Sequence, residues 1–238
     1  MLLFYTGPIL PEKWKGKSMS IHYYFAGSLF CHKDVIGNHL LAESICENSE
    51  GKYLAKLPQR EENQLRPSPL EIRDNDYRML LESQLALFNF DGSDLDSGTV
   101  AEFLAARFLD IPCVLLRTDF RSAGDQNADG EDWNLMCSGY PHTRVISAGA
   151  MELYQKHFRD GVATLSGLKS FYDELSGILI ASFDDVMKEP SCFENREDAE
   201  RTYRHFIRIC GGTLPRQFDA RRISSVISAR GLFGTQRS

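Results

Sequence analysis

Between residues 21 and 146, short apolar runs alternate with longer segments of helical periodicity, and this alternation limits the possible folds more than any other feature of the chain. The apolar runs predict strands at Ile21–Ala26, Tyr53–Leu57, Gln84–Phe90, Cys113–Thr118 and Arg144–Ile146. In the segments between them, apolar residues recur every three or four positions, as on one face of a helix. This order predicts an α/β fold, in which a five-stranded parallel sheet is covered by helices on both faces.

A flavodoxin-like (Rossmann-like) strand order would place the first and third strands at the switch point of the sheet, where ligands bind beyond the carboxyl ends of the strands. The loop after the first strand contains Gly27, and the loop after the third strand contains Asp94 and Asp96. We therefore expect a ligand pocket between these two loops.

Acidic residues crowd around the second of these loops. Asp94, Asp96 and Glu102 surround a Ser-Gly-Thr turn at the predicted start of a helix. Thr99 and Glu102 have the spacing of a capping box, in which a hydroxyl and a carboxylate bind the free N–H groups of the first helical turn. A capping role and a catalytic role for Glu102 both stay open at this point.

The composition is that of an ordinary globular protein. Of the 238 residues, 42% are hydrophobic and 25% are charged, and the formal net charge is -6. The negative charge argues against a nucleic-acid partner, and no apolar stretch approaches the roughly 20 residues of a membrane span. We expect a cytoplasmic protein that binds neither nucleic acid nor membrane.

Motifs for metals and common cofactors are missing from the sequence. The six cysteines form no C-x-x-C pair, and the six histidines show no ligand-like spacing. The segment DQNADG (125–130) matches the first half of a calcium loop, but the twelfth position of that loop, where a Glu should bind the ion, is Met136. Phosphate-loop, dinucleotide-binding and nucleophile-elbow motifs are also absent. We predict no metal and no cofactor.

The chain extends beyond the α/β region at both ends. Residues 1–18 are interpreted as an N-terminal extension, and because a Lys-rich run ends it, Met19 is a candidate for the native start. Residues 19–150 are the predicted α/β domain, and residues 151–238 a helical C-terminal extension.

One helix of that extension has clear boundaries in the sequence. Asn195 has the position of a helix cap and Gly211 that of a helix stop. From Glu200 onward the chain has eight arginines and two acids, so a basic tail that binds phosphate is one interpretation. Because this helix carries an apolar stripe, we expect instead an extension that packs on the core or at a subunit interface.

Five segments of the chain, in this order, resemble the nucleoside 2-deoxyribosyltransferase family. They are YYFAGSLF (23–30), RDNDYRMLLESQLALFNFDG (73–92), DSGTVAE (96–102), LLRTDFR (115–121) and NLM (134–136). The resemblance covers roughly residues 21–146. It implies an enzyme that transfers 2-deoxyribose between purine or pyrimidine bases, so that deoxynucleosides and free nucleobases are its partners and no cofactor takes part.

The resemblance also implies roles for three carboxylates. Glu102 matches the nucleophile of the family, which forms a covalent glycosyl-enzyme intermediate, and a helix start favours the ionised form that a nucleophile needs. Because the departing base needs a proton, Asp96, six residues earlier, is the expected proton donor and acceptor. Asp76, in the preceding helix, is expected to orient the base. Together these groups would carry out a retaining double displacement.

Five further residues are expected to bind the substrate. Tyr24 and Gly27 match positions that line the sugar and base pocket, and the missing side chain of Gly27 would let a ligand approach the backbone. Asn134 and Met136 match a segment of the family that contacts the sugar across a subunit interface, which implies a homo-oligomer. Gln59, just after the second strand, is a candidate contact for the base.

Two other functions stay open. The wider family contains 2'-deoxynucleoside 5'-phosphate N-hydrolases, which have the same nucleophile but hold a phosphate. In that branch a Ser occupies the position of Asp96, whose negative charge would repel a phosphate, so free nucleosides are the favoured substrates here. A nucleoside-binding sensor without turnover is the third interpretation, but such a protein would be expected to have lost the nucleophile, whereas Glu102, Asp96 and Asp76 are all present.

Overall fold

The centre of the molecule is a parallel sheet, seen in a computed structural model that describes residues 20–61, 68–119, 134–158, 162, 164–231 and 233. Its strands are β1 (Ile21–Gly27), β2 (Tyr53–Lys56), β3 (Leu85–Asn89), β4 (Cys113–Arg117) and β5 (Thr143–Ser147). The strand order is β2-β1-β3-β4-β5, and each neighbouring pair is parallel. This is the flavodoxin-like order, so the predicted α/β fold is confirmed.

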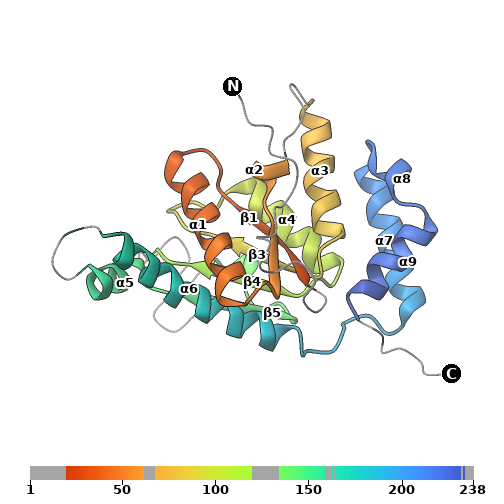
Figure 1. Ribbon diagram of the computed structural model, residues 1–238. Helices are drawn as coiled ribbons and strands as arrows, with labels where there is room; N and C mark the ends of the chain where they lie inside the picture. The colour runs from red at the N-terminus through yellow and green to blue at the C-terminus, as the bar shows by residue number, and fades with distance from the viewer. Residues whose placement is uncertain are drawn as a thin grey trace.

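Helices cover both faces of the sheet, as the sequence predicts (Figure 1). One face is covered by α1 (His32–Asn48), α5 (Ala150–His157) and α6 (Leu165–Val186). The other face is covered by α3 (Pro69–Leu81) and α4 (Ser97–Phe108). Because alternate residues of a strand point to opposite faces, Tyr23 of β1 belongs to the core under α1 and α6, whereas Tyr24 belongs to the core under α3 and α4.

Two short elements complete the α/β region. The helix α2 (Pro58–Glu61) follows β2 directly, and the 3-10 helix η2 (Leu135–Cys137) precedes β5. None of the helices in the described residues is both long enough and apolar enough to cross a bilayer.

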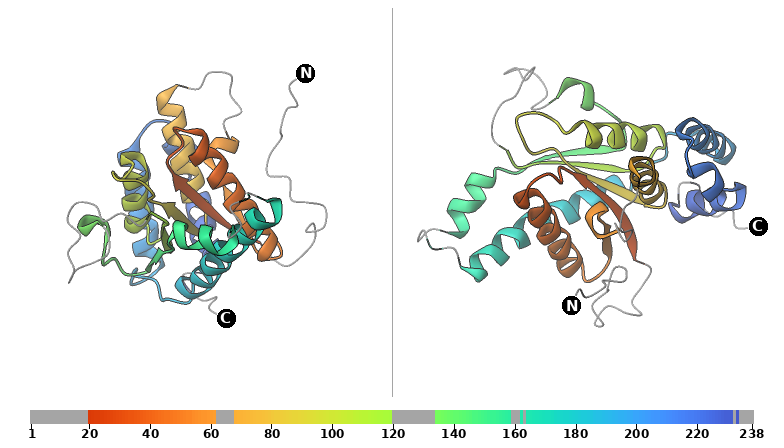
Figure 2. Two further views of the ribbon diagram at one scale, coloured as in Figure 1. Left: turned by 90° about the vertical axis from the view of Figure 1, so that its left-hand side faces the viewer. Right: turned by 90° about the horizontal axis from the view of Figure 1, so that it is seen from above.

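The end of the chain returns to the α3 side of the sheet. There α7 (Arg196–Cys210), α8 (Leu214–Gln217) and α9 (Ala220–Ala229) lie beside α3, on the side away from α1 (Figures 1 and 2). As predicted, the Asn195 side chain caps α7, accepting a hydrogen bond from the Asp198 N–H at 3.0 Å, and Gly211 ends the helix with a φ of 63°. Tyr203 is buried and donates a 2.9 Å hydrogen bond to the Leu109 carbonyl after α4. The predicted helical extension is confirmed, and it packs on the core.

Gly212, in the turn between α7 and α8, is expected to tolerate no side chain. Its φ is +58°, and a Cβ at this position would lie 2.2 Å from Oδ2 of the buried Asp74. We expect Gly212→Ala to lower the free energy of unfolding by about 2 to 4 kcal/mol, because both the backbone and the contact resist the methyl group. Urea denaturation would measure this. Gly177→Ala in α6, where a Cβ meets nothing within 4 Å, is the matched control and is expected to be neutral or slightly stabilising.

Three sequence predictions lie outside the described residues. They concern the N-terminal extension at residues 1–18, the start at Met19, and the calcium-like segment at residues 125–130.

Candidate active site

Glu102 lies in α4, and the start of that helix differs from the sequence prediction. The N-cap is Asp96, whose Oδ2 accepts hydrogen bonds from the backbone N–H and the hydroxyl of Thr99, both at 2.8 Å. Asp is preferred to Thr at an N-cap, so Thr99 lies within the first turn. The capping box predicted for Thr99 and Glu102 is therefore wrong. Glu102 is the sixth residue of the helix, which begins at Ser97, and so belongs to the second turn.

A hydrogen bond joins Glu102 to the sheet. Tyr24, on β1, is fully buried, and its hydroxyl donates to Oε1 of Glu102 at 2.8 Å. Tyr24 can reach α4 because its side chain points to the face of the sheet that α4 covers. The contact connects the first strand with the helix that follows the third strand, which are the two elements at the switch point.

Burial raises the pKa of Glu102 to about 8. The negative charges of Asp76 and Asp96 act in the same direction, whereas the hydrogen bond from Tyr24 lowers the pKa. The expectation that a helix start would favour the ionised form is therefore wrong in direction. The carboxyl lies one turn deeper than expected, where the loss of water disfavours its charge more than the helix dipole favours it.

The two other predicted carboxylates approach Glu102 from different elements. Asp76 comes from α3 and Asp96 from the N-cap of α4, and both are close enough to act on the titration of Glu102. One oxygen of Asp96 is engaged in the helix cap; its other oxygen has no hydrogen bond within the described part of the chain. The structure thus brings Tyr24, Asp76 and Asp96 together around Glu102.

A fifth residue of this cluster, Tyr77, is not indicated by the sequence. It follows Asp76 on α3 and is half buried, and burial, then the charges of Cys210 and Glu102, raise the pKa of its hydroxyl. Its ring packs edge-on against Phe206 of α7, with 5.5 Å between the ring centroids. The only local signal is its place beside Asp76, because Phe206 lies far away in the sequence.

Gly27 and Gln59, both expected to bind the substrate, make close contacts with the protein itself. A Cβ on Gly27 would lie 3.1 Å from the Asn89 side chain and 3.3 Å from that of Asn38, so the space beside this glycine is occupied. Gln59, on α2, donates a 2.9 Å hydrogen bond to the Val35 carbonyl of α1. Its Oε1 is buried and has no hydrogen bond within the described residues.

Asn134 and Met136 lie at the surface around η2. The side chain of Asn134 caps this short helix, accepting hydrogen bonds from the N–H groups of Met136 and Cys137 at 3.0 and 3.2 Å. The side chain of Met136 is 73% exposed. The segment is anchored near α4, because Tyr140 donates to the Met136 carbonyl and packs edge-on against Phe103, beside Glu102.

A cavity of about 620 Å³ lies on the opposite face of the sheet. Residues of α1, α5 and α6 line it, among them Asn38 and Tyr172, together with Asn89 at the end of β3. Neither Tyr24 nor Glu102 is among the lining residues, so this cavity is distinct from the cluster around Glu102. Within the described ranges, no three His, Cys, Asp or Glu side chains are arranged to hold a metal ion.

Comparisons with known proteins find a family and solved structures that this chain resembles. The family described as nucleoside 2-deoxyribosyltransferase matches residues 23–152. A conserved protein from Enterococcus faecalis V583, known from a crystal structure, is 25% identical in sequence to this chain. The match covers 60% of this chain and 100% of that protein's chain, with a TM-score of 0.46. A 2-deoxyribosyltransferase from Bacillus psychrosaccharolyticus is 20% identical and covers 49% of this chain and 79% of its own, with a TM-score of 0.36. The comparison with curated proteins finds no match. Because the family match spans more than half of the sequence, the chain belongs to the nucleoside 2-deoxyribosyltransferase family.

Proposed function

We propose that this protein exchanges the bases of 2-deoxyribonucleosides through a covalent glycosyl intermediate on Glu102. The supporting observation is the partly buried carboxyl of Glu102, which accepts a hydrogen bond from Tyr24 and is approached by Asp76 and Asp96. A fixed carboxylate with further acids beside it is the arrangement that retaining glycosyl transfer requires.

The reaction proceeds in two balanced steps. In the first, a carboxylate oxygen of Glu102 attacks C1' of the deoxyribose, the C1'–N bond breaks, and the departing base takes a proton from Asp96. In the second, a ring nitrogen of the incoming base attacks C1', the C1'–O bond to Glu102 breaks, and Asp96 takes the proton that this nitrogen loses. Asp76 orients the base during both steps.

Burial of Glu102 favours the first step. Its charge is disfavoured by the loss of water, as the raised pKa of about 8 indicates. Attack on C1' converts the carboxylate into a neutral ester, so the desolvation that disfavours the starting ion is relieved as the bond forms. At neutral pH only the ionised minority of free enzyme molecules can react.

The substrate-binding residues are assigned by the same proposal. Tyr24 orients Glu102. Gly27 contributes only its backbone to the first-loop side of the pocket, because the Asn38 and Asn89 side chains fill the space beside it. Gln59 contributes its Oε1, which has no hydrogen bond within the described residues, to the α2 side. Asn134 and the exposed Met136 complete the pocket of a neighbouring subunit in a homo-oligomer, supported by the 65% exposure of Leu135 between them. The exchange would serve the salvage of deoxynucleosides.

A chromatographic base-exchange assay tests the proposed function. Purified protein is incubated with 2'-deoxynucleosides and unlike free bases, with Glu102→Ala as the negative control. We expect a new deoxynucleoside with the native protein and none with the variant. Free base and sugar alone, or turnover only of the 5'-phosphates, would assign the chain to the hydrolases instead, and no turnover across the panel would favour a nucleoside-binding sensor.

A further inference from the structure

The C-terminal helices bind the first half of α3, the helix that carries Asp76 and Tyr77. Asp74 is only 1% exposed, and its Oδ2 accepts hydrogen bonds from the backbone N–H and the hydroxyl of Thr213 at 2.6 and 2.9 Å. Burial alone would raise the pKa of Asp74, but these bonds and the neighbouring Arg73 hold it below its usual range. Arg73 also donates to the Cys210 carbonyl at the end of α7, at 2.8 Å.

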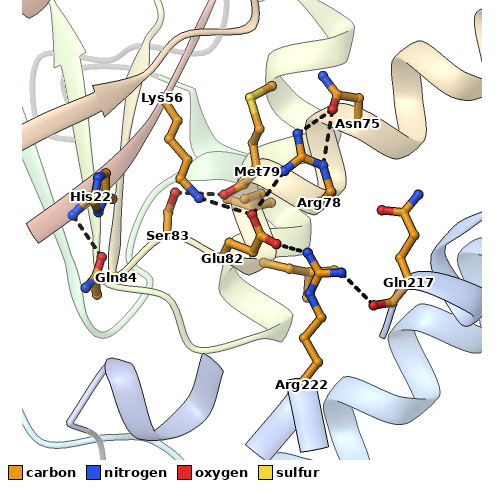
Figure 3. Close-up of polar contacts among 12 residues, drawn as sticks. His22, Lys56, Asn75, Arg78, Met79, Glu82, Ser83, Gln84, Gln217 and Arg222 are labelled. Carbon is orange, nitrogen blue, oxygen red and sulfur yellow. Dashed lines mark hydrogen bonds and ion pairs between the residues drawn. The ribbon is translucent and has the colours of Figure 1, made fainter. Parts of the chain in front are cut away.

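The C-terminal end of α3 is bound by α9. Glu82, which follows the helix, forms ion pairs with Arg222 of α9, Lys56 and Arg78 (Figure 3). Arg230, just after α9, is buried and donates to the carbonyls of Ser83 at 2.8 Å and of Leu81 at 2.6 Å. The Leu81 carbonyl is the last of α3, where the hydrogen bonds of the helix leave carbonyls free, and Ser83 follows two residues later.

Phe206 makes the contact between these two ends. It projects from α7 against the ring of Tyr77, and both rings are partly buried against the core that contains Tyr24 and Phe103. Phe206 therefore packs against the segment of α3 that carries Asp76 and Tyr77. The family match ends at residue 152, before α7 begins, so this support belongs to the chain outside the matched region.

We propose that α7–α9 position the active site, with Phe206 as a positioning residue that acts through Tyr77. By holding α3 at both ends and in the middle, these helices keep Asp76 at a fixed distance from Glu102 and limit the access of water to its partly buried carboxyl. The inference rests on the proposed function for its consequence in catalysis, but the effect on Glu102 itself can be measured without turnover.

The electrostatic argument depends on which groups face Glu102. They are Tyr24 from β1, Asp76 and Tyr77 from α3, and Asp96 from the cap of α4. Tyr24 is fixed by the sheet, and Asp96 by its bonds to Thr99. The groups on α3 are those that the C-terminal helices hold, so loosening α3 should move Asp76 away and admit water. Both changes favour the ionised form of Glu102.

The test replaces Phe206 and follows the titration of Glu102. The free energy of unfolding is measured between pH 4 and 9 for the Phe206→Ala variant and for the double variant that combines Phe206→Ala with Glu102→Gln. The pH dependence of the difference between the two reports the pKa of Glu102 in the folded state. We expect this pKa to fall by about one unit relative to the native background, and kcat for base exchange to fall about tenfold with KM altered less than threefold. Phe206→Leu, which retains an apolar contact, should restore most of both values.

Two variants separate positioning from general stability. Leu179→Ala in α6 removes a fully buried side chain on the opposite face of the sheet and should destabilise the protein while leaving the pKa of Glu102 unchanged. Thr213→Val removes only the hydroxyl bond to Asp74 and replaces Phe206→Ala as the test if that variant does not fold. An unchanged Glu102 pKa in the folded test variant would refute the positioning role. Absence of base exchange in the native protein would refute the proposed function, but the measurement of the Glu102 pKa would still be valid.

Discussion

Replacing Glu102 by Gln is expected to abolish base exchange and at the same time to stabilise the fold. Activity should fall by at least about 10³-fold, because Gln cannot form the glycosyl ester. Gln retains an acceptor for the Tyr24 hydroxyl, which now binds Glu102 at 2.8 Å. The pKa of Glu102 is about 8 in the folded protein, against an ordinary value of 4.5. Its contribution to stability is therefore complete below pH 4.5 and is lost as the pH rises towards 8.

The size of the stabilisation follows from the same shift. Each pH unit between the two pKa values costs the native protein about 1.4 kcal/mol, so Glu102→Gln should be more stable by about 3 kcal/mol at pH 7 and by little at pH 4. Urea denaturation at several pH values would measure the difference. Glu194→Gln, at an exposed position, is the control and should change neither activity nor stability. A Glu102→Gln protein no more stable than the native one at pH 7 would show that Glu102 is not strongly desolvated.

Removing the hydroxyl of Tyr24 is expected to shift the pH dependence of activity upward. In the native protein, the rising limb of kcat/KM against pH should have its midpoint near pH 8, because the ionised form of Glu102 is the proposed nucleophile and burial raises its pKa to about 8. The hydrogen bond from Tyr24 opposes that shift. A bond to a charged acceptor contributes about 1.5 to 3 kcal/mol, so Tyr24→Phe should move the rising limb up by about 1 to 2 units and lower kcat/KM at pH 7 by about 10- to 100-fold.

The neighbouring tyrosine provides the matched control. Tyr23 points to the opposite face of the sheet, and its hydroxyl is buried without a hydrogen bond in the described residues. Tyr23→Phe removes the same atom from the same strand and should leave the pH profile unchanged while slightly stabilising the fold. Equal shifts in Tyr23→Phe and Tyr24→Phe would mean that the hydrogen bond to Glu102 does not set the profile.

The sheet could be predicted from the sequence because its strands are short, apolar and clearly interrupted. The strand predicted at Ile21–Ala26 occupies Ile21–Gly27, and that predicted at Cys113–Thr118 ends one residue earlier. The helix α7 could also be predicted from the sequence, because Asn195 and Gly211 mark its ends. The sequence predicted a helical extension but did not locate α6. That helix contains Gly167 and Gly177 and an unbroken apolar run, which obscures the spacing by which amphipathic helices are recognised.

The clustering of four residues of the candidate site could be predicted from the sequence, but their electrostatics could not. The resemblance to the family identified Tyr24, Asp76, Asp96 and Glu102, and the structure places them together. The helix dipole can be anticipated from local sequence, whereas the desolvation of Glu102 depends on β1 and α3, which are remote in the chain. The role of Tyr77 could not be predicted for the same reason. Its packing partner Phe206 is remote in the chain, in a helix that the family match does not include.

Because α6 and α7 contribute to the core, the part of the chain that can fold extends beyond the part that matches the family. The family match ends at residue 152, but Leu179 and Phe183 of α6 share a core with Tyr23, and Tyr203 of α7 shares one with Tyr24. A chain cut where the homology ends would expose apolar surface on both sides of the sheet at once. Truncation to the recognisable domain would therefore yield an aggregation-prone fragment and not a minimal enzyme.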